Sequence, residues 1–166
     1  MRKEQFICPY MVYDSVDELE SQDAELVRLA HEATKGSYAT KGSYAPYSMF
    51  HVGAAVRMAN GEIVTGNNIE NAAYPSGLCA ERVAIFAAMA KFPGVAIEAL
   101  AVVAHSKTKV IAEPAAPCGA CRQVMVEVEQ VSKRPLRVLC QGETGPIMAF
   151  DGIETLVPFI FNNTLL

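Results

Sequence analysis

Three cysteines in two short motifs have the type and spacing of metal ligands. Cys118 and Cys121 are three positions apart and follow Pro117, which suits the first turn of a helix, so both thiols can reach one ion from a single helix face. Cys79 stands at the beginning of a second predicted helix. The positive end of a helix favours thiolate over thiol, and three thiolates suit zinc. The sequence therefore predicts a zinc ion held by these three residues.

The number of ligands distinguishes a catalytic zinc site from a structural one. A structural site closes its tetrahedron with a fourth protein ligand, whereas three protein ligands leave one position for water. Nothing near either motif is an obvious fourth ligand, and the other two cysteines, Cys8 and Cys140, lie in other surroundings. The pattern favours catalytic zinc. The alternatives are a redox pair at Cys118 and Cys121 and a small buried side chain at Cys79.

Two charged residues, Glu81 and Arg82, follow Cys79 on a helix that is otherwise apolar. Burial of a charge is costly unless the charge is used or paired. We predict that Glu81 takes a proton from water that zinc activates. Arg82 is expected to donate a hydrogen bond to a ligand sulfur and to offset the net negative charge of zinc with three thiolates. The alternative for Arg82 is a surface salt bridge.

The composition describes one globular domain without an affinity for nucleic acid. The chain has 166 residues, of which 51% are hydrophobic and 19% are charged. This length predicts a single domain, and the apolar content excludes disorder of the whole chain. The 18 acidic and 14 basic residues leave a formal net charge of -4, which provides no positive field for nucleic acid.

The sequence also predicts where the protein is found. The longest clean apolar run, residues 83–90, is far shorter than the about 18 residues that a membrane-spanning helix needs. Acidic residues and a proline interrupt the start of the chain before a signal peptide can form. The odd cysteine count and the Cys-x-x-Cys spacing suit metal binding in a reducing compartment. We expect a cytoplasmic protein with no membrane partner.

Hydrophobic periodicity predicts strands that alternate with helices. Helices are expected over 23–35, 79–91 and 119–130, and strands over 50–58, 62–66, 97–104, 136–140 and 146–150. The helix over 79–91 is apolar on nearly every side, which predicts that protein encloses it. This order of elements predicts a layered α/β fold, with about five strands and with helices on both faces of the sheet.

Two segments fall outside this pattern. Residues 1–22 are expected to form an N-terminal extension, either an added edge strand or a loose arm, before a single domain over 23–166. Residues 34–39 are repeated as residues 40–45, which indicates a local duplication that lengthens a loop. His31 and His105 have the setting of ordinary surface residues, and no histidine is a predicted zinc ligand.

Five runs of the sequence resemble, in the same order, those of the small zinc-dependent cytidine deaminases. They are Tyr44-Ala45-Pro46-Tyr47-Ser48, residues 50–55, residues 68–72, residues 79–82 and residues 117–123. The last two runs alone indicate only the wider class of zinc deaminases. The resemblance covers about residues 24–161 and implies a three-layer α-β-α sandwich with a mixed sheet. It also implies a homotetramer that deaminates cytidine and deoxycytidine to uridine and deoxyuridine in pyrimidine salvage.

The resemblance also implies roles for single residues. Glu81 is the proton shuttle between the attacking water, ring N3 and the departing amino group. The implied substrate contacts are Asn68 and Glu70 with the ribose hydroxyls, Phe50 with the base, the Ala80 backbone N–H with the ring carbonyl, and Phe161 in the pocket of a neighbouring subunit. Without the resemblance, Asn68 is an ordinary turn residue, Phe50 an ordinary core residue, and the tail docks on its own core.

Other functions remain open on the sequence alone. A related zinc deaminase for another aminated base or a nucleoside antibiotic would share the same metal motifs. A non-catalytic zinc-binding or thiol redox protein would share the cysteines but leave cytidine unchanged. An editor of RNA or DNA fits least, because the acidic balance offers no basic track for a strand.

Overall fold

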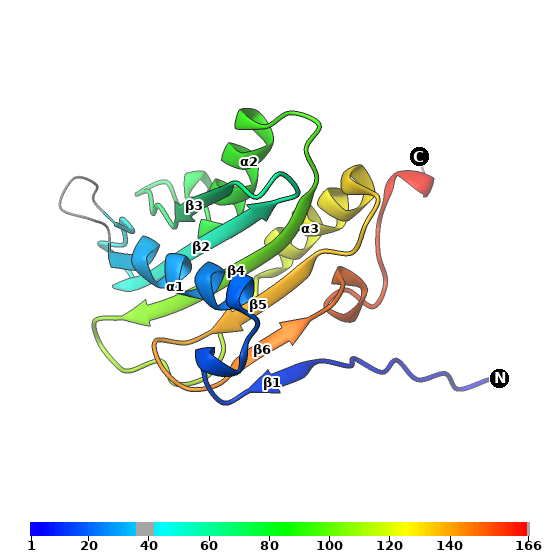
Figure 1. Ribbon diagram of the computed structural model, residues 1–166, viewed down its shortest axis with the longest axis horizontal. Coiled ribbons are helices and arrows are strands. Elements are labelled where there is room, and N and C mark those ends of the chain that lie inside the picture. The colour runs from blue at the N-terminus through cyan, green and yellow to red at the C-terminus, as the bar shows by residue number, and fades with distance from the viewer. Residues whose placement is uncertain (36–41, 166) are drawn as a thin grey trace.

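The computed structural model describes residues 1–35 and 42–165. It contains one six-stranded mixed sheet in the order β1-β6-β5-β4-β2-β3 (Figure 1). The strands are β1 (Met11–Tyr13), β2 (Phe50–Met58), β3 (Ile63–Asn67), β4 (Ile97–Ser106), β5 (Arg137–Gln141) and β6 (Ile147–Phe150), and the helices are α1 (Ser21–Lys35), α2 (Ala80–Lys91) and α3 (Gly119–Ser132). Strands β4 and β5 run parallel, and the other four neighbouring pairs are antiparallel.

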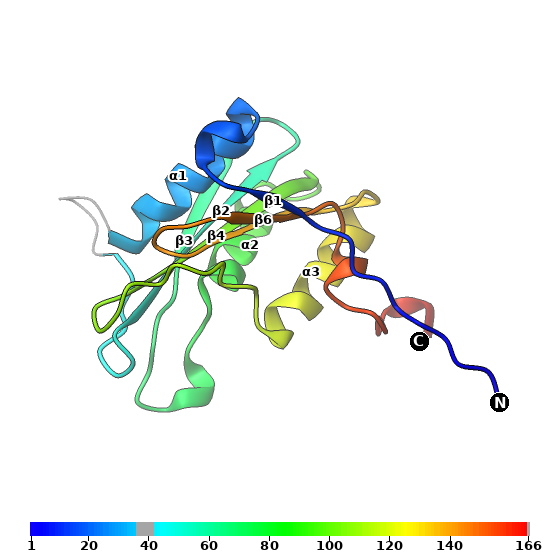
Figure 2. The ribbon, with the colours of Figure 1, turned by 90° about the horizontal axis from the view of Figure 1, so that it is seen from below.

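The sheet is the middle of three layers. Helix α1 covers one face, and α2 and α3 cover the other (Figure 2). Because side chains alternate along a strand, the same strands supply apolar residues to both faces, so two cores form on opposite sides of the sheet. The predicted three-layer α/β fold is confirmed.

The sheet has six strands instead of about five, because part of the N-terminal segment joins it. Met11 to Tyr13 pair with β6 in antiparallel register, from Met11 opposite Ala149 to Tyr13 opposite Ile147. Residues 1–10 have no regular secondary structure. The segment is therefore an edge strand preceded by an extended arm, which combines both alternatives that the sequence left open. The extra loop length expected from the duplication falls on residues 36–41, outside the described residues.

Helix α2 is enclosed on one side only, so the prediction of an enclosed helix is wrong. Its buried face is formed by Ala80, Glu81, Ala84, Ile85 and Ala88. On the other face, the side chains of Phe86 and Met89 are 45% and 37% exposed. The helix packs on the sheet through one stripe, and within the described part of the chain no element covers its apolar outer face.

Two predicted surface histidines are half-buried instead. His31 on α1 contacts Gln141 on β5, with 2.8 Å between Nε2 and Oε1. His105 on β4 pairs with Glu143, with 3.1 Å between Nε2 and Oε1. Both lie on the side of the sheet that α1 covers, where a polar ring can be half-buried because it has a hydrogen-bonding partner.

Two glycines let the helices approach the sheet closely. A Cβ atom on Gly53 of β2 would lie 2.1 Å from the carbonyl oxygen of Ala30 in α1. A Cβ atom on Gly66 of β3 would lie 2.5 Å from the backbone nitrogen of Ala84 in α2. Both helices thus rest directly on strand backbone, which fixes the position of the α2 N-terminus. None of the described helices has the length and apolar character needed to cross a bilayer.

We predict that Gly53→Ala lowers the free energy of unfolding by about 3 kcal/mol, because the added methyl group meets helix backbone that cannot move aside. Urea unfolding of the purified protein measures this change. Gly152→Ala is the control, since its backbone is extended and its nearest neighbours are 3.5 Å or more away. The control should lose less than about 1 kcal/mol. Equal losses in the two variants would contradict the close packing of α1 on β2.

Candidate active site

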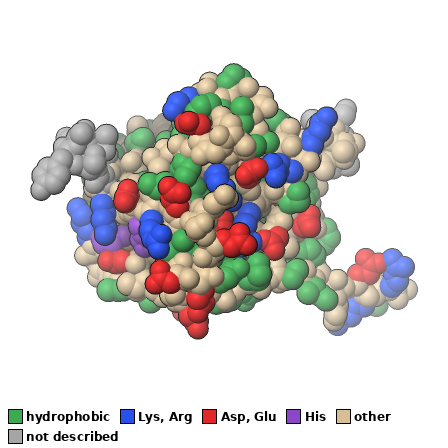
Figure 3. Space-filling model, in the orientation of Figure 1, with side chains coloured by type: hydrophobic (Ala, Val, Ile, Leu, Met, Phe, Trp, Pro, Cys, Tyr) green, Lys and Arg blue, Asp and Glu red, His purple; other side chains and the backbone are tan. Residues whose placement is uncertain are grey.

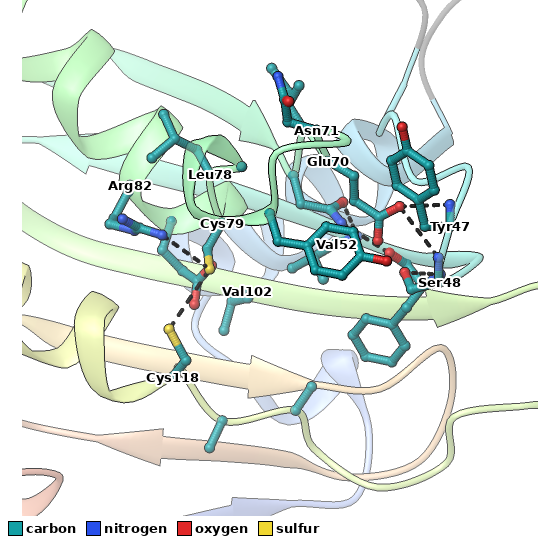
Figure 4. Close-up of a pocket in the computed structure, with 18 residues that line it drawn as sticks. Tyr47, Ser48, Val52, Glu70, Asn71, Leu78, Cys79, Arg82, Val102 and Cys118 are labelled. Carbon is teal, nitrogen blue, oxygen red and sulfur yellow. Dashed lines mark hydrogen bonds between the residues drawn. The ribbon is translucent and has the colours of Figure 1, made fainter.

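The three predicted zinc ligands converge at the beginnings of two helices. Cys79 and Cys118 are the N-cap residues of α2 and α3, and Cys121 lies in the first turn of α3. The Cys79 and Cys118 sulfurs are 3.7 Å apart, the Cys118 and Cys121 sulfurs are 3.5 Å apart, and all three lie within 4.8 Å of one another. The contact between Cys79 and Cys118 is visible in Figure 4.

These sulfurs fit a zinc ion in both chemistry and spacing. Thiolates bound at about 2.3 Å in a tetrahedron lie about 3.8 Å apart, close to the separations between the neighbouring sulfurs here. Among the described residues, no other histidine, cysteine or carboxylate joins the cluster. The three cysteines would hold the metal and leave one position of the tetrahedron open.

Ionisation of the cluster is favoured at Cys79. The pKa of its thiol is lowered to about 5, first by a hydrogen bond from the Cys121 thiol and further by the Arg82 guanidinium. The same hydrogen bond raises the pKa of Cys121, which keeps its proton as the donor, and burial and the nearby negative charges of Glu81 and Cys79 raise it further. The neighbouring thiols and the arginine thus stabilise a first thiolate.

Arg82 lies where the sequence predicted it. Its Nη2 donates to the Cys79 sulfur over 3.6 Å (Figure 4). Arg82 forms no salt bridge with any carboxylate in the described ranges, which argues against the alternative of a surface ion pair. The guanidinium therefore faces the sulfur cluster and can offset its negative charge.

Glu81 is a buried carboxyl group beside the sulfurs. Its side chain belongs to a residue only 4% exposed, and it lines the same pocket as Cys79 and Cys118. Burial raises the pKa of Glu81, and the negative charge favoured at Cys79 raises it further. A carboxyl group in such surroundings is suited to holding and returning a proton.

A pocket of about 830 Å³ opens beside the cluster. Its walls are formed by Tyr47, Ser48, Phe50, Val52, Asn68, Ile69, Glu70, Asn71, Tyr74, Gly77, Leu78, Cys79, Glu81, Arg82, Val102, Ala115, Ala116 and Cys118. Three predicted site residues are absent from these walls. Ala80 and Cys121 are buried behind them, and Phe161 lies on the C-terminal tail, 57% exposed.

Two polar side chains line the pocket at some remove from the sulfurs. The Asn68 amide bridges the edge of β2, since its Oδ1 accepts from the Val52 N–H and its Nδ2 donates to the Phe50 carbonyl. The Glu70 carboxylate accepts from the backbone N–H groups of Tyr47 and Ser48 (Figure 4). The Ser48 hydroxyl and these N–H groups lower the pKa of Glu70, so this group is a fixed, ionised acceptor.

Comparison with known proteins identifies a family whose metal motifs match this site. Residues 20–135 match the family described as the cytidine and deoxycytidylate deaminase zinc-binding region. The cytidine deaminase of Halalkalibacterium halodurans is 49% identical over 103 residues, which are 62% of this chain and 69% of that protein. The chain belongs to the cytidine deaminase family of zinc enzymes. It is accordingly a hydrolytic deaminase with a zinc cofactor.

Solved cytidine deaminase structures share the fold over most of their length. The enzyme of Burkholderia pseudomallei superimposes with a TM-score of 0.68 at 38% identity, over 82% of this chain and 97% of that chain. The enzyme of Mycobacterium tuberculosis superimposes with a TM-score of 0.62 at 31% identity, over 86% of this chain and 99% of that chain. The likeness therefore extends well beyond the metal motifs.

Two tyrosines at the pocket received no role from the sequence. The rings of Tyr47 and Tyr74 have centroids 6.1 Å apart, and both side chains are more than half exposed. Tyr47 belongs to the first run of the deaminase resemblance, and Tyr74 begins a three-residue 3-10 helix, directly before Pro75. Exposed aromatic residues beside turns are a signal for binding surfaces that could have identified both.

The C-terminal tail is attached to α3, the helix that begins after Cys118 and carries Cys121. Arg122 donates to the Leu156 carbonyl over 2.8 Å, and Gln123 donates to the Phe161 carbonyl over 2.9 Å. Leu156 is buried in the core, whereas the Phe161 ring is exposed. The tail thus docks on its own chain through backbone while its aromatic ring faces outward. Insertion of that ring into a neighbouring subunit stays a prediction.

We predict that Cys121→Ala removes the zinc and lowers the melting temperature, because metal binding contributes folding free energy. Elemental analysis and thermal unfolding of the purified proteins measure both effects. Cys140→Ala is the matched control, since this thiol is equally buried in the same core but lies outside the cluster. The control should keep about one zinc ion per chain. A Cys121 variant with full zinc content would show that the ligand set is different.

Proposed function

We propose that this protein hydrolyses free cytidine and deoxycytidine to uridine and deoxyuridine and releases ammonia. The observation that supports this most is one pocket with two chemically distinct parts. One part is lined by Cys79, Cys118 and the buried Glu81 carboxyl, with the buried Cys121 completing the sulfur cluster behind this wall, and the other is lined by Asn68 and Glu70. The first suits hydrolysis of an aminated ring, and the second suits a sugar with free hydroxyl groups.

Cys79, Cys118 and Cys121 would hold the metal in this reaction. When bound, zinc supplies a Lewis acid that makes water a nucleophile near neutral pH. Arg82 donates to the Cys79 sulfur and reduces the electron density that the thiolates give to the metal. The protein thereby keeps a site of three negative ligands acidic enough to activate water.

Glu81 moves the protons. It accepts one from the attacking water, protonates ring N3, and transfers a proton to the amino group that leaves C4 as ammonia. The overall balance is cytidine plus water to uridine plus ammonia. The buried position of Glu81 raises its pKa, which assists the steps in which the carboxyl group gives its proton back.

The charges of the pocket favour a nucleoside over a nucleotide. Among the lining residues Arg82 is the one cation, and it is directed at the Cys79 sulfur. Glu70 is an ionised carboxylate that can accept a hydrogen bond from a sugar hydroxyl but repels a phosphate. These features support cytidine and deoxycytidine rather than deoxycytidylate as substrates, with Phe50 beside the base and the Ala80 N–H as its carbonyl partner.

The surface supports assembly into a homo-oligomer, which we propose to be a tetramer. The outer face of α2 exposes Phe86 and Met89, and the tail exposes Phe159 and Phe161. Apolar surface of this kind favours association. On the face shown in Figure 3, acidic and basic side chains are interspersed, which offers no basic track for a nucleic acid strand. We further propose a cytoplasmic role in pyrimidine salvage, a catalytic domain over residues 23–166 and an N-terminal extension over residues 1–22.

We predict that Glu81→Gln keeps the zinc and lowers turnover of cytidine by about 10² to 10⁴, the range for loss of a general acid and base. The fall in ultraviolet absorbance of cytidine and the release of ammonia measure turnover, and elemental analysis measures zinc. A variant with near-normal turnover would refute the role of Glu81. Wild-type protein that carries zinc but leaves cytidine unchanged would support a non-catalytic zinc protein or an enzyme for another base.

We predict that cytidine 5′-monophosphate is deaminated with a kcat/KM at least about 10²-fold below that of cytidine, because the described lining of the pocket offers the phosphate no free cation and presents an ionised carboxylate. The same absorbance assay compares the two substrates at equal zinc content. Comparable values would show that the pocket accepts nucleotides.

A further inference from the structure

We propose that His51 is a positioning residue for the sugar of the substrate, acting through Ser43 on the Asn68 amide. This inference rests on the proposed nucleoside deaminase activity. His51 is on β2 and Ser43 precedes it in the loop after α1, whereas Asn68 follows β3. The three side chains meet at the edge of the pocket, and Asn68 is the one that lines it.

The orientation of the Asn68 amide is fixed by the backbone of β2. The Val52 N–H lies 2.8 Å from Oδ1, and an N–H group requires an acceptor. The Phe50 carbonyl lies 2.9 Å from Nδ2, and a carbonyl requires a donor. A flipped amide would place donor against donor and acceptor against acceptor, so Oδ1 must be the atom near Val52.

This orientation of the Asn68 amide determines which atom donates and which accepts in each hydrogen bond from His51 to Asn68. Ser43 Oγ contacts Asn68 Oδ1, which can only accept, so the Ser43 hydroxyl donates its single hydrogen there. Ser43 Oγ can then only accept from His51, whose Nδ1 is 3.1 Å away. The hydrogen of the ring is therefore on Nδ1. The relay runs from His51 N–H to Ser43 O–H to Asn68 Oδ1.

Among the described residues, the ring of His51 has no hydrogen bond other than the one with Ser43. The residue is only 9% exposed, and its buried Nε2 has no hydrogen-bond partner among the residues described. Its cross-strand neighbour on β4 is His105, whose ring centroid is 6.2 Å away and which pairs with Glu143. Burial of a polar ring is costly unless the ring forms a hydrogen bond. Because the contact with Ser43 is the hydrogen bond that the described structure gives this ring, it accounts for a histidine at this position.

The relay leaves one hydrogen of Asn68 for a ligand. An amide side chain can accept twice and donate twice. Val52 and Ser43 use both acceptor positions of Oδ1, and Phe50 uses one Nδ2 hydrogen. The second Nδ2 hydrogen is the one donor that Asn68 can offer to the pocket. Two donors on Oδ1 also polarise the amide and strengthen that remaining N–H.

The test compares His51→Ala with wild type on cytidine and on 2′,3′-dideoxycytidine, which lacks the 2′ and 3′ hydroxyls and keeps the 5′ hydroxyl. We expect the KM for cytidine to rise about 3- to 10-fold, the effect of one weakened hydrogen bond, with kcat nearly unchanged. For dideoxycytidine, wild type and variant should have the same KM. Equal rises for both substrates, or a fall in kcat alone, would overturn the proposal.

A second pair of variants separates hydrogen bonding from packing. His51→Asn places an amide N–H near the position of Nδ1 and should recover most of the wild-type KM. His51→Gln, of similar size, carries its amide one carbon further along the side chain and should not. Recovery by both variants or by neither would overturn the relay.

Ser43→Ala tests the same relay without altering the strand, and it carries the test if His51→Ala fails to fold. It should raise the KM for cytidine and leave dideoxycytidine unaffected; an unchanged KM for cytidine would contradict the relay. The proposed function has a separate readout. Wild-type protein inactive on cytidine refutes the function itself, whereas active wild type with unaltered His51 and Ser43 variants refutes only the relay.

Discussion

Three thiols at the beginnings of two helices lie close enough to bind one metal ion, and the packing of both helices maintains this arrangement. Cys79 and Cys118 lie 39 positions apart in sequence but only 3.7 Å apart between sulfurs. Both helices begin at the same place over one face of the sheet. Close contact of α2 with Gly66 of β3 sets the position of Cys79, and the tail contacts of Arg122 and Gln123 hold the beginning of α3.

The concentration of charge at this place explains the residues around it. The thiolates and the Glu81 carboxylate repel one another because they lie close together. The Arg82 guanidinium beside the Cys79 sulfur reduces this repulsion, and the pKa of the buried Glu81 is raised. Farther along the pocket, the pKa of Glu70 is shifted in the opposite direction and is lowered. Backbone N–H groups and a hydroxyl keep it ionised. The two carboxyl groups of this pocket thus have pKa values shifted in opposite directions, which supports the proposed proton transfer at Glu81 and hydrogen bonding at Glu70.

The sequence predicted what depends on local spacing and missed what depends on contacts between distant segments. Local spacing and periodicity predicted the pair Cys118 and Cys121, the helix after Cys79 and the strands over 50–58 and 62–66. For the N-terminal segment the sequence left an edge strand and a loose arm open, because the pairing of residues 11–13 is decided by the free edge of β6, which is remote in sequence. The exposed outer face of α2 was missed for a related reason, since apolar periodicity does not say whether the covering surface belongs to the same chain.

In the candidate site, too, local spacing could be predicted from the sequence and contacts between distant segments could not. The proposed metal ligands, Glu81 and Arg82 could be named from their own spacing, and the structure brings them together. The contact of His51 with Ser43 could not be named, because it requires the loop after α1 to return to the edge of β2 beside Asn68. Side chains that act through another residue leave no periodic signal of their own.

X-ray absorption at the zinc edge of the purified protein tests the central claim most directly, because it reports which atoms surround the metal. The account predicts three sulfur neighbours at about 2.3 Å and one lighter atom, an oxygen or nitrogen, at about 2.0 Å. Four sulfur neighbours would describe a closed structural site. A shell dominated by nitrogen or oxygen would show that the three thiols are not the zinc ligands.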